Sequence, residues 1–146
     1  MAAKEKTKAA KEKAKFVIVS GKRKTSVAKA KIFPGTGKVT INKIPHELLY
    51  EFHKFAIEEP LRIAKKVLKE INYDIFVTVT GGGRESQIEA ARLAIARALV
   101  QKTKSEALRK ELLKYDKYLL VADVRRKEAC KPGDSKARSR RQKSYR

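Results

Sequence analysis

The last 23 residues of the chain, from Val124 to Arg146, cannot fold by themselves. They contain ten lysines and arginines against two acids, and their few apolar residues follow no period. Such a segment buries too little apolar surface to offset the backbone entropy that folding would cost. At about 3.3 Å per residue, it reaches roughly 75 Å when fully extended. We therefore predict a compact body with a long cationic tail, whose simplest partner is a folded polyanion, that is, nucleic acid.

Positive charge is concentrated at the two ends of the chain and in one short internal segment. Of the formal net charge of +21, residues 1–15 contribute +4, residues 20–31 contribute +5 and residues 124–146 contribute +8. The much longer remainder is therefore nearly balanced. This segregation is typical of a protein that binds nucleic acid, and it favours that partner over an anionic membrane.

Neither a membrane nor an oxidising compartment is expected for this chain. No apolar run reaches the ~18 residues of a membrane span. Residues 1–15 also lack the apolar core of a signal peptide. The single cysteine, Cys130, rules out an internal disulfide, as expected in a reducing compartment. We therefore expect a cytoplasmic protein.

The body is predicted to be one sheet covered by helices on one face, an α+β fold. The predicted strands are 16–20, 25–33, 39–42 and 74–80, and the predicted helices are 45–55, 60–69, 86–102 and 105–113. The first three strands are expected to form an antiparallel meander. Leu48, Leu49, Phe52 and Phe55 form the apolar side of the first helix, and Pro60 opens the second.

Three parts follow from these patterns. We expect a basic, disordered N-terminal tail at 1–15, a globular body at 16–123 and an extended basic tail at 124–146. Just before this second tail, residues 118–122 form either a short extended run or a docking segment.

The glycine-rich segments do not complete a nucleotide-binding motif. Residues 35–38 (GTGK) resemble the end of a P-loop, but a strand follows where that motif needs a helix. Residues 81–83 (GGG) do lie between a predicted strand and a predicted helix, and Arg84 follows them. Two interpretations stay open for this turn. It either lets the helix approach the sheet closely, or it clamps an RNA phosphate at the helix N-terminus.

No arrangement of residues predicts catalysis. His46 and His53 are two helical turns apart, too far for one metal ion, and no cysteine or carboxylate set completes a site. Nothing resembles a nucleophile elbow. We therefore expect no catalytic residue, no metal, no cofactor and no small-molecule substrate.

Three separated segments resemble the small-subunit ribosomal protein S9 family. They are SGKRKTSVAKAKIFPGTGKVTIN from residue 20, GGGRESQIEAARLAIARAL from residue 81 and DVRRKEACKPGDSKARSRRQKSYR from residue 123. The resemblance covers about residues 16–146, and the ending KSYR resembles the archaeal and eukaryotic branch of the family.

The resemblance implies a ribosomal S5 domain 2-like fold and a structural role without catalysis. It implies binding to rRNA in the head of the small subunit, beside neighbouring head proteins. It also implies that the tail extends toward the anticodon stem-loop of the peptidyl-site tRNA. The residues expected to bind rRNA are Lys22, Arg23, Lys24, Thr25, Gly81, Gly82, Gly83, Arg84, Arg125, Arg126, Lys127, Lys136, Arg138, Arg140 and Arg141. Those expected to contact tRNA are Lys143, Ser144, Tyr145 and Arg146.

Three alternatives are kept beside this interpretation. A protein of the ribonuclease P type, which shares this general fold, would bind precursor tRNA and support its cleavage by an RNA. The identity of the RNA that co-purifies with the chain separates this alternative from the ribosomal one. A DNA-compacting protein with histone-like tails would bind duplex DNA and folded rRNA with similar affinity. An enzyme of the nucleotide-kinase type on the related fold would need a phosphate loop and a base, and the incomplete motifs disfavour it.

Overall fold

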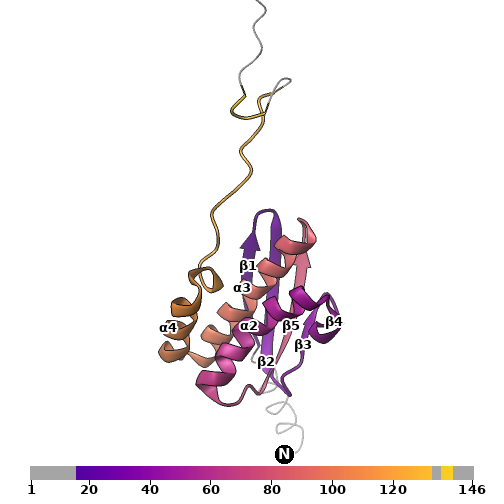
Figure 1. The fold of residues 1–146 in the computed structure, drawn as a ribbon. Coiled ribbons are helices and arrows are strands. Elements are labelled where there is room, and N and C mark those ends of the chain that lie inside the picture. The colour runs from indigo at the N-terminus through magenta and orange to yellow at the C-terminus, as the bar shows by residue number, and fades with distance from the viewer. Residues whose placement is uncertain (1–15, 133–135, 140–146) are drawn as a thin grey trace, which may run out of the picture.

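The computed structural model describes residues 16–132 and 136–139, drawn in colour in Figure 1. The predicted N-terminal tail at 1–15 lies outside the described residues. The elements are β1 (Val17–Arg23), β2 (Ser26–Pro34), β3 (Val39–Ile41), β4 (Ile44–Pro45), the 3-10 helix η1 (His46–Leu48), α2 (Glu51–Leu68), β5 (Tyr73–Thr80), α3 (Arg84–Thr103), α4 (Glu106–Tyr115) and the 3-10 helix η2 (Lys117–Leu119).

The strands form a single five-stranded sheet in the order β1-β2-β5-β3-β4. The pair β3 and β5 is parallel, whereas the other neighbouring strands are antiparallel. The helices lie on one side of this sheet (Figure 1), so the predicted α+β class and its one-sided cover are confirmed. Among the described residues, no helix combines the length and the apolar character that a membrane crossing requires.

The predicted three-stranded meander is wrong, because β5 lies between β2 and β3. The hairpin of β1 and β2 does form, with Gly21 opposite Ala28. β5 then takes the centre of the sheet, and its buried residues Ile75, Val77 and Val79 alternate with exposed ones. A strand with this pattern buries most apolar surface in a central position, whereas the three residues of β3 offer little surface for pairing with β2.

Helix α3 packs closely against β1 and β2. Its buried alanines, which include Ala90 and Ala94, present no side chain beyond a methyl group. Gly21 lies directly beneath them, and a Cβ atom at this position would overlap the carbonyl oxygen of Ala90 and lie 2.8 Å from the nitrogen of Ala94. The alanines and Gly21 together therefore allow the helix backbone to approach the strand backbone.

Residues 51–68 form one helix, so the prediction that Pro60 opens a second helix is wrong. Pro60 has no N–H to donate and costs α2 one hydrogen bond. It is buried with Ile57, Leu61 and Ala64, and this packing offsets the loss. The expected apolar side is also corrected, because Phe52 and Phe55 are exposed.

The body ends in a docking segment rather than a strand. Helix α4 begins as predicted at Ser105, whose hydroxyl accepts a hydrogen bond from the N–H of Leu108 at 3.3 Å. After α4, the chain makes η2 and buries Leu119 completely against the core. Of the two alternatives for residues 118–122, the structure has the docked one.

Asp74 fastens the loop that precedes β3 to the start of β5. Its Oδ1 accepts hydrogen bonds from the backbone N–H groups of Thr36, Gly37 and Lys38 at 2.8, 3.0 and 2.9 Å. The bond from Lys38, joined by those from Thr36 and Gly37, holds the pKa of Asp74 below its ordinary value. This loop sets the parallel register of β3 on β5.

We expect Gly21→Ala to lower the free energy of unfolding by about 1–3 kcal/mol, because the added methyl group overpacks the contact between β1 and α3. Urea denaturation of the purified chain measures this change. Gly83→Ala is the matched control, since no atom lies within 4 Å of a Cβ at that position. Equal losses in the two variants would contradict the close-packing argument.

We expect Asp74→Asn to remove part of the acid sensitivity of folding. With a lowered folded pKa, Asp74 stabilises the fold above the unfolded-state pKa of about 3.9, and this contribution is lost as the pH falls through the folded pKa. The difference in free energy of unfolding between wild type and variant should therefore shrink from about pH 5 to about pH 2. Glu47→Gln, at an exposed glutamate, is the control. A difference that stays constant with pH would refute this assignment.

Candidate nucleic-acid interface

The tip of the β1–β2 hairpin lies beside the glycine turn that follows β5. The register pairs Val27 with Thr80, so the next residue of each segment brings Ser26 beside Gly81. A Cβ on Gly81 would lie 2.7 Å from the carbonyl oxygen of Thr25, and Gly81 and Gly82 have φ angles of +74° and +70°. This positive-φ backbone favours glycine at both positions. Two segments far apart in the sequence, 22–25 and 81–84, therefore form one end of the body.

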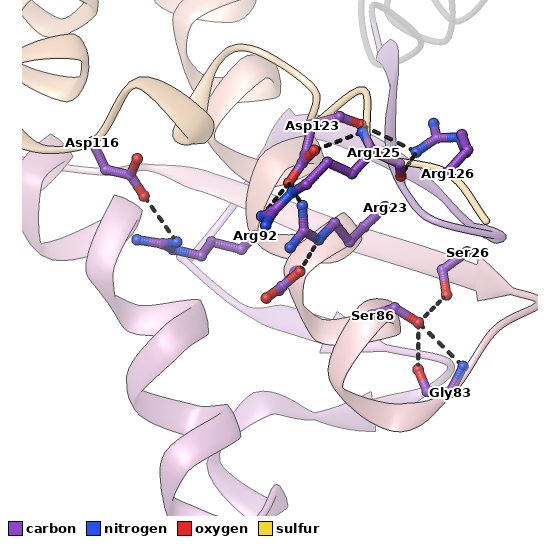
Figure 2. A network of polar contacts seen from close by, with 10 residues as sticks. Arg23, Ser26, Gly83, Ser86, Arg92, Asp116, Asp123, Arg125 and Arg126 are labelled. Atoms are coloured by element: carbon purple, nitrogen blue, oxygen red, sulfur yellow. Dashed lines mark hydrogen bonds and ion pairs between the residues drawn. The ribbon is translucent and has the colours of Figure 1, made fainter. Parts of the chain in front are cut away.

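Two serines join the hairpin to the glycine turn (Figure 2). The hydroxyl of Ser26 donates to the carbonyl of Gly81 at 2.8 Å and lies 2.8 Å from the hydroxyl of Ser86. Ser86 in turn donates to the carbonyl of Gly83 and accepts from its N–H. Both serines are buried. The geometry supports the tight-turn interpretation of the glycines, while their predicted contact with an RNA phosphate stays a prediction.

The C-terminal tail is anchored at this same end by Asp123. Figure 2 shows its carboxylate between Arg23 of β1 and Arg125. Asp123 forms an ion pair with Arg23 and accepts three hydrogen bonds from Arg125, from the backbone N–H, Nε and Nη2, at 2.8, 2.8 and 2.7 Å. Because Asp123 is only 7% exposed, this carboxylate exchanges its hydration for these two arginines. We call residues 123–127 the tail root.

Other arginines complete the attachment of the tail root. Arg126 donates to the carbonyl of Asp123 at 3.1 Å. Arg97 of α3 donates to the carbonyl of Leu120 at 2.8 Å and to that of Ser20 in β1 at 3.0 Å. One side chain therefore links the helix, the first strand and the docking segment. The tail root therefore follows a docking segment that is already hydrogen-bonded to the body.

Sequence reasoning missed both Asp123 and Arg97. A signal for Asp123 was present, because it is the only acid between Asp116 and Glu128 and immediately precedes the basic run. No comparable signal marked Arg97, which lies among regularly spaced helix residues. Its two backbone acceptors come together only through tertiary packing.

The cleft around the tail root has charges of both signs. It is about 200 Å³ in volume, and its charged lining consists of Lys22, Arg23, Arg92, Arg125, Glu89, Asp116 and Asp123. Within it, Arg23 pairs with both Glu89 and Asp123, and Arg92 pairs with Asp116 at 3.2 Å. Because carboxylates already pair with these arginines, the cleft is poorly suited to a free anion. The contact of Arg23 with rRNA stays a prediction. Its side chain already has two partners within the protein, Glu89 and Asp123.

The cations outside this cleft are available to a partner. Lys24, Arg84 and Lys127 are exposed, and so is Thr25 at the hairpin tip. The side chain of Arg125 is 75% exposed although it binds Asp123, so one face of its guanidinium remains open. The tip of the β1–β2 hairpin and the start of α3 lie at the end of the body toward which the tail runs (Figure 1).

The described part of the tail beyond the root has few contacts. Lys136 is exposed, and Arg138 forms an exposed pair with Glu128 at 2.9 Å. The ammonium group of Lys131 donates to the carbonyl of Ser139 at 2.8 Å. Six residues with predicted RNA contacts lie outside the described residues: Arg140, Arg141, Lys143, Ser144, Tyr145 and Arg146.

Both histidines have contacts within the body. Nε2 of His53 lies 2.8 Å from a carboxylate oxygen of Glu85, and Nδ1 of His46 lies 3.3 Å from the carbonyl of Val39. In the part of the chain that the structure describes, no group of three His, Cys, Asp or Glu residues is placed to hold a metal ion.

Comparison with known proteins identifies the family. The family model described as ribosomal protein S9/S16 matches residues 21–146. A protein of Desulfurococcus amylolyticus named small ribosomal subunit protein uS9 is 46% identical over 136 residues, which cover 92% of this chain and 96% of that protein. Proteins of the same name from Pyrobaculum aerophilum and Methanococcus vannielii are 46% and 44% identical, over 92% and 90% of this chain and 94% and 99% of their own lengths.

These relatives cover at least 90% of this chain, and archaeal species are among them, in agreement with the predicted branch. The S5 domain 2-like fold fits this family. On the family match and these identities, the chain belongs to the ribosomal protein S9/S16 family.

Proposed function

We propose that this protein binds small-subunit rRNA through the hairpin tip, the glycine turn and the tail root, and extends its tail toward the peptidyl-site tRNA. The observation that carries this proposal is the anchoring of the tail by Asp123 at the end of the body that holds the two other predicted RNA-binding segments. Membership of a ribosomal protein family supports the ribosome, in the cytoplasm, as its location. We propose no catalytic role.

The chemistry of this end of the body suits a phosphate backbone. Lys24 and Arg84 are exposed there, and the glycine turn has no side chains to keep a phosphate away from its backbone. Lysines and arginines that neutralise phosphates release counterions, so affinity falls steeply with salt. Residues that bear hydroxyl groups, such as Thr25, add hydrogen bonds to phosphate or sugar. This surface serves as the rRNA-docking site of the body.

The tail supplies the longer reach. It leaves from a fixed point, and its roughly 75 Å of extended length is enough to run through crevices of a folded RNA. Its ordering entropy is offset when it binds, as for other disordered segments that fold on a partner. The family resemblance assigns the contact with peptidyl-site tRNA to Lys143, Ser144, Tyr145 and Arg146. The family match supports this interpretation over the ribonuclease P alternative.

We expect Asp123→Asn to weaken binding to small-subunit rRNA, although it makes the chain more positive. The variant removes the ion pair between Arg23 and the carboxylate at position 123. The tail is then no longer held in one direction where it leaves the body. The free energy of unfolding should fall by about 1–3 kcal/mol, because charged hydrogen bonds are lost at a nearly buried site. Filter binding to rRNA over a range of salt concentrations measures the affinity.

Glu128→Gln is the matched control for Asp123→Asn. It removes one negative charge from the same region, but its partner Arg138 lies on the tail and the pair is exposed. Its affinity for rRNA should rise slightly or stay unchanged. Tighter binding by both variants would show that only net charge matters and that the anchor does not.

We expect deletion of Lys143–Arg146 to weaken the retention of peptidyl-site tRNA by roughly tenfold, the scale of two modest charge-assisted contacts. The body should stay folded and bound to rRNA. The dissociation rate of tRNA from purified small subunits measures the effect. Lys4→Ala with Lys6→Ala removes the same two positive charges from the other end of the chain and should leave the rate unchanged. Equal tRNA retention in the deletion variant and the wild type would exclude a tRNA contact by these residues.

A further inference from the structure

An apolar cluster is exposed at the start of α2. Leu48, Tyr50, Phe52 and Phe55 are 77%, 66%, 72% and 52% exposed. The ring centroids of Tyr50 and Phe52 are 5.6 Å apart. Phe55 follows Phe52 by three residues and lies on the same side of the helix. Four large apolar side chains exposed within eight residues exceed the single exposed apolar residues that are normal on a protein surface. We call Leu48, Tyr50, Phe52 and Phe55 the aromatic patch.

The aromatic patch does not serve the core of this protein. The buried side of α2 consists of Ile57, Pro60, Leu61 and Ala64, which pack into the main cluster. The helix therefore has two apolar sides, of which the described residues cover only one. Leaving phenylalanine and leucine in water forfeits the stabilisation that their burial provides. Their exposure is expected where a partner covers them.

The exposed charged side chains in the same short stretch as the patch are glutamates, in contrast to the excess of cations in the chain as a whole. Residues 44–61 contain four glutamates and one lysine, in a chain with a net charge of +21. Glu58 and Glu59 form ion pairs with Arg62 and Arg92. Glu47 and Glu51 are exposed and have no ion pair within the described residues. A phosphate backbone would be repelled here, whereas a cationic polypeptide would be attracted.

We propose that the aromatic patch docks a lysine- and arginine-rich segment of a neighbouring small-subunit protein, which places apolar side chains against Phe52 and Phe55 and cations against Glu47 and Glu51. This inference rests on the proposed ribosomal function. Proteins that pack on rRNA are cationic for the same reason as this chain, so a basic segment is what a neighbour offers. RNA and a second copy of this chain are the other possible occupants, and the experiment separates them.

The protein surface and the RNA surface share a border. His53 of α2 contacts Glu85 in the first turn of α3, and Arg84 immediately precedes that glutamate. An occupant of the aromatic patch therefore lies close to the glycine turn. A neighbouring protein at this position fills the space beside the rRNA without competing for its phosphates.

The experiment places the photo-crosslinking residue p-benzoylphenylalanine at Phe52 in the full chain, assembled into purified small subunits. Irradiation, RNase digestion and peptide mass spectrometry identify what it touches. The proposal expects an RNase-resistant crosslink to another protein, at a segment rich in lysine and arginine. The same probe at Tyr115, an exposed aromatic residue at the end of α4, gives the background. An RNase-sensitive crosslink, a crosslink to a second copy or a yield no higher than background would overturn the proposal.

A charge reversal gives a second, independent readout. Glu47→Lys with Glu51→Lys should lower the yield of the protein crosslink from Phe52 by roughly tenfold, because like charges then face each other. If RNA occupied the patch, the same change would raise the yield. Sedimentation distinguishes a failure of the proposed function from a failure of this inference. A wild-type chain that fails to sediment with small subunits would refute the proposed function, whereas one that sediments without the protein crosslink would refute only this inference.

Discussion

The buried carboxylate of Asp123 is the interaction on which the arrangement of the binding surfaces depends. A charged group with 7% exposure is tolerated only when partners replace its hydration, and here Arg23 and Arg125 do so. Arg23 belongs to the first strand, whereas Arg125 belongs to the segment that follows the docking segment, so one carboxylate joins the two. The cationic segment thereby leaves the body from one defined point.

The close packing of α3 on the sheet makes this anchor possible. Gly21 and the alanines of α3 bring the helix backbone onto β1, and Arg97 and Glu89 project from the same helix toward the docking segment and Arg23. A larger residue at Gly21 would move the helix and its polar side chains together. Packing that contains no functional group therefore determines where the functional groups lie.

The two surfaces of the body differ in the chemistry that they offer. Hairpin tip, glycine turn and tail root present exposed cations and accessible backbone, as a phosphate partner requires. The aromatic patch presents apolar side chains beside Glu47 and Glu51, as a basic polypeptide requires. A protein in an RNA particle needs both, because it must bind RNA and still leave a place for protein neighbours.

The sequence alone determined the one-sided α+β body, the strands β1, β2 and β5, helices α3 and α4, and the cationic tail, because periodicity, caps and charge are local properties. It did not predict that β5 separates β2 from β3, that Pro60 lies inside α2, or that Phe52 and Phe55 are exposed. Those outcomes depend on which surfaces compete for the core, and that competition takes place between segments far apart in the chain. For the same reason the tertiary structure alone revealed the roles of Asp123 and Arg97, whose partners lie on separate elements. The residues predicted to bind were visible in the sequence, whereas the residues that position them became visible only in the fold.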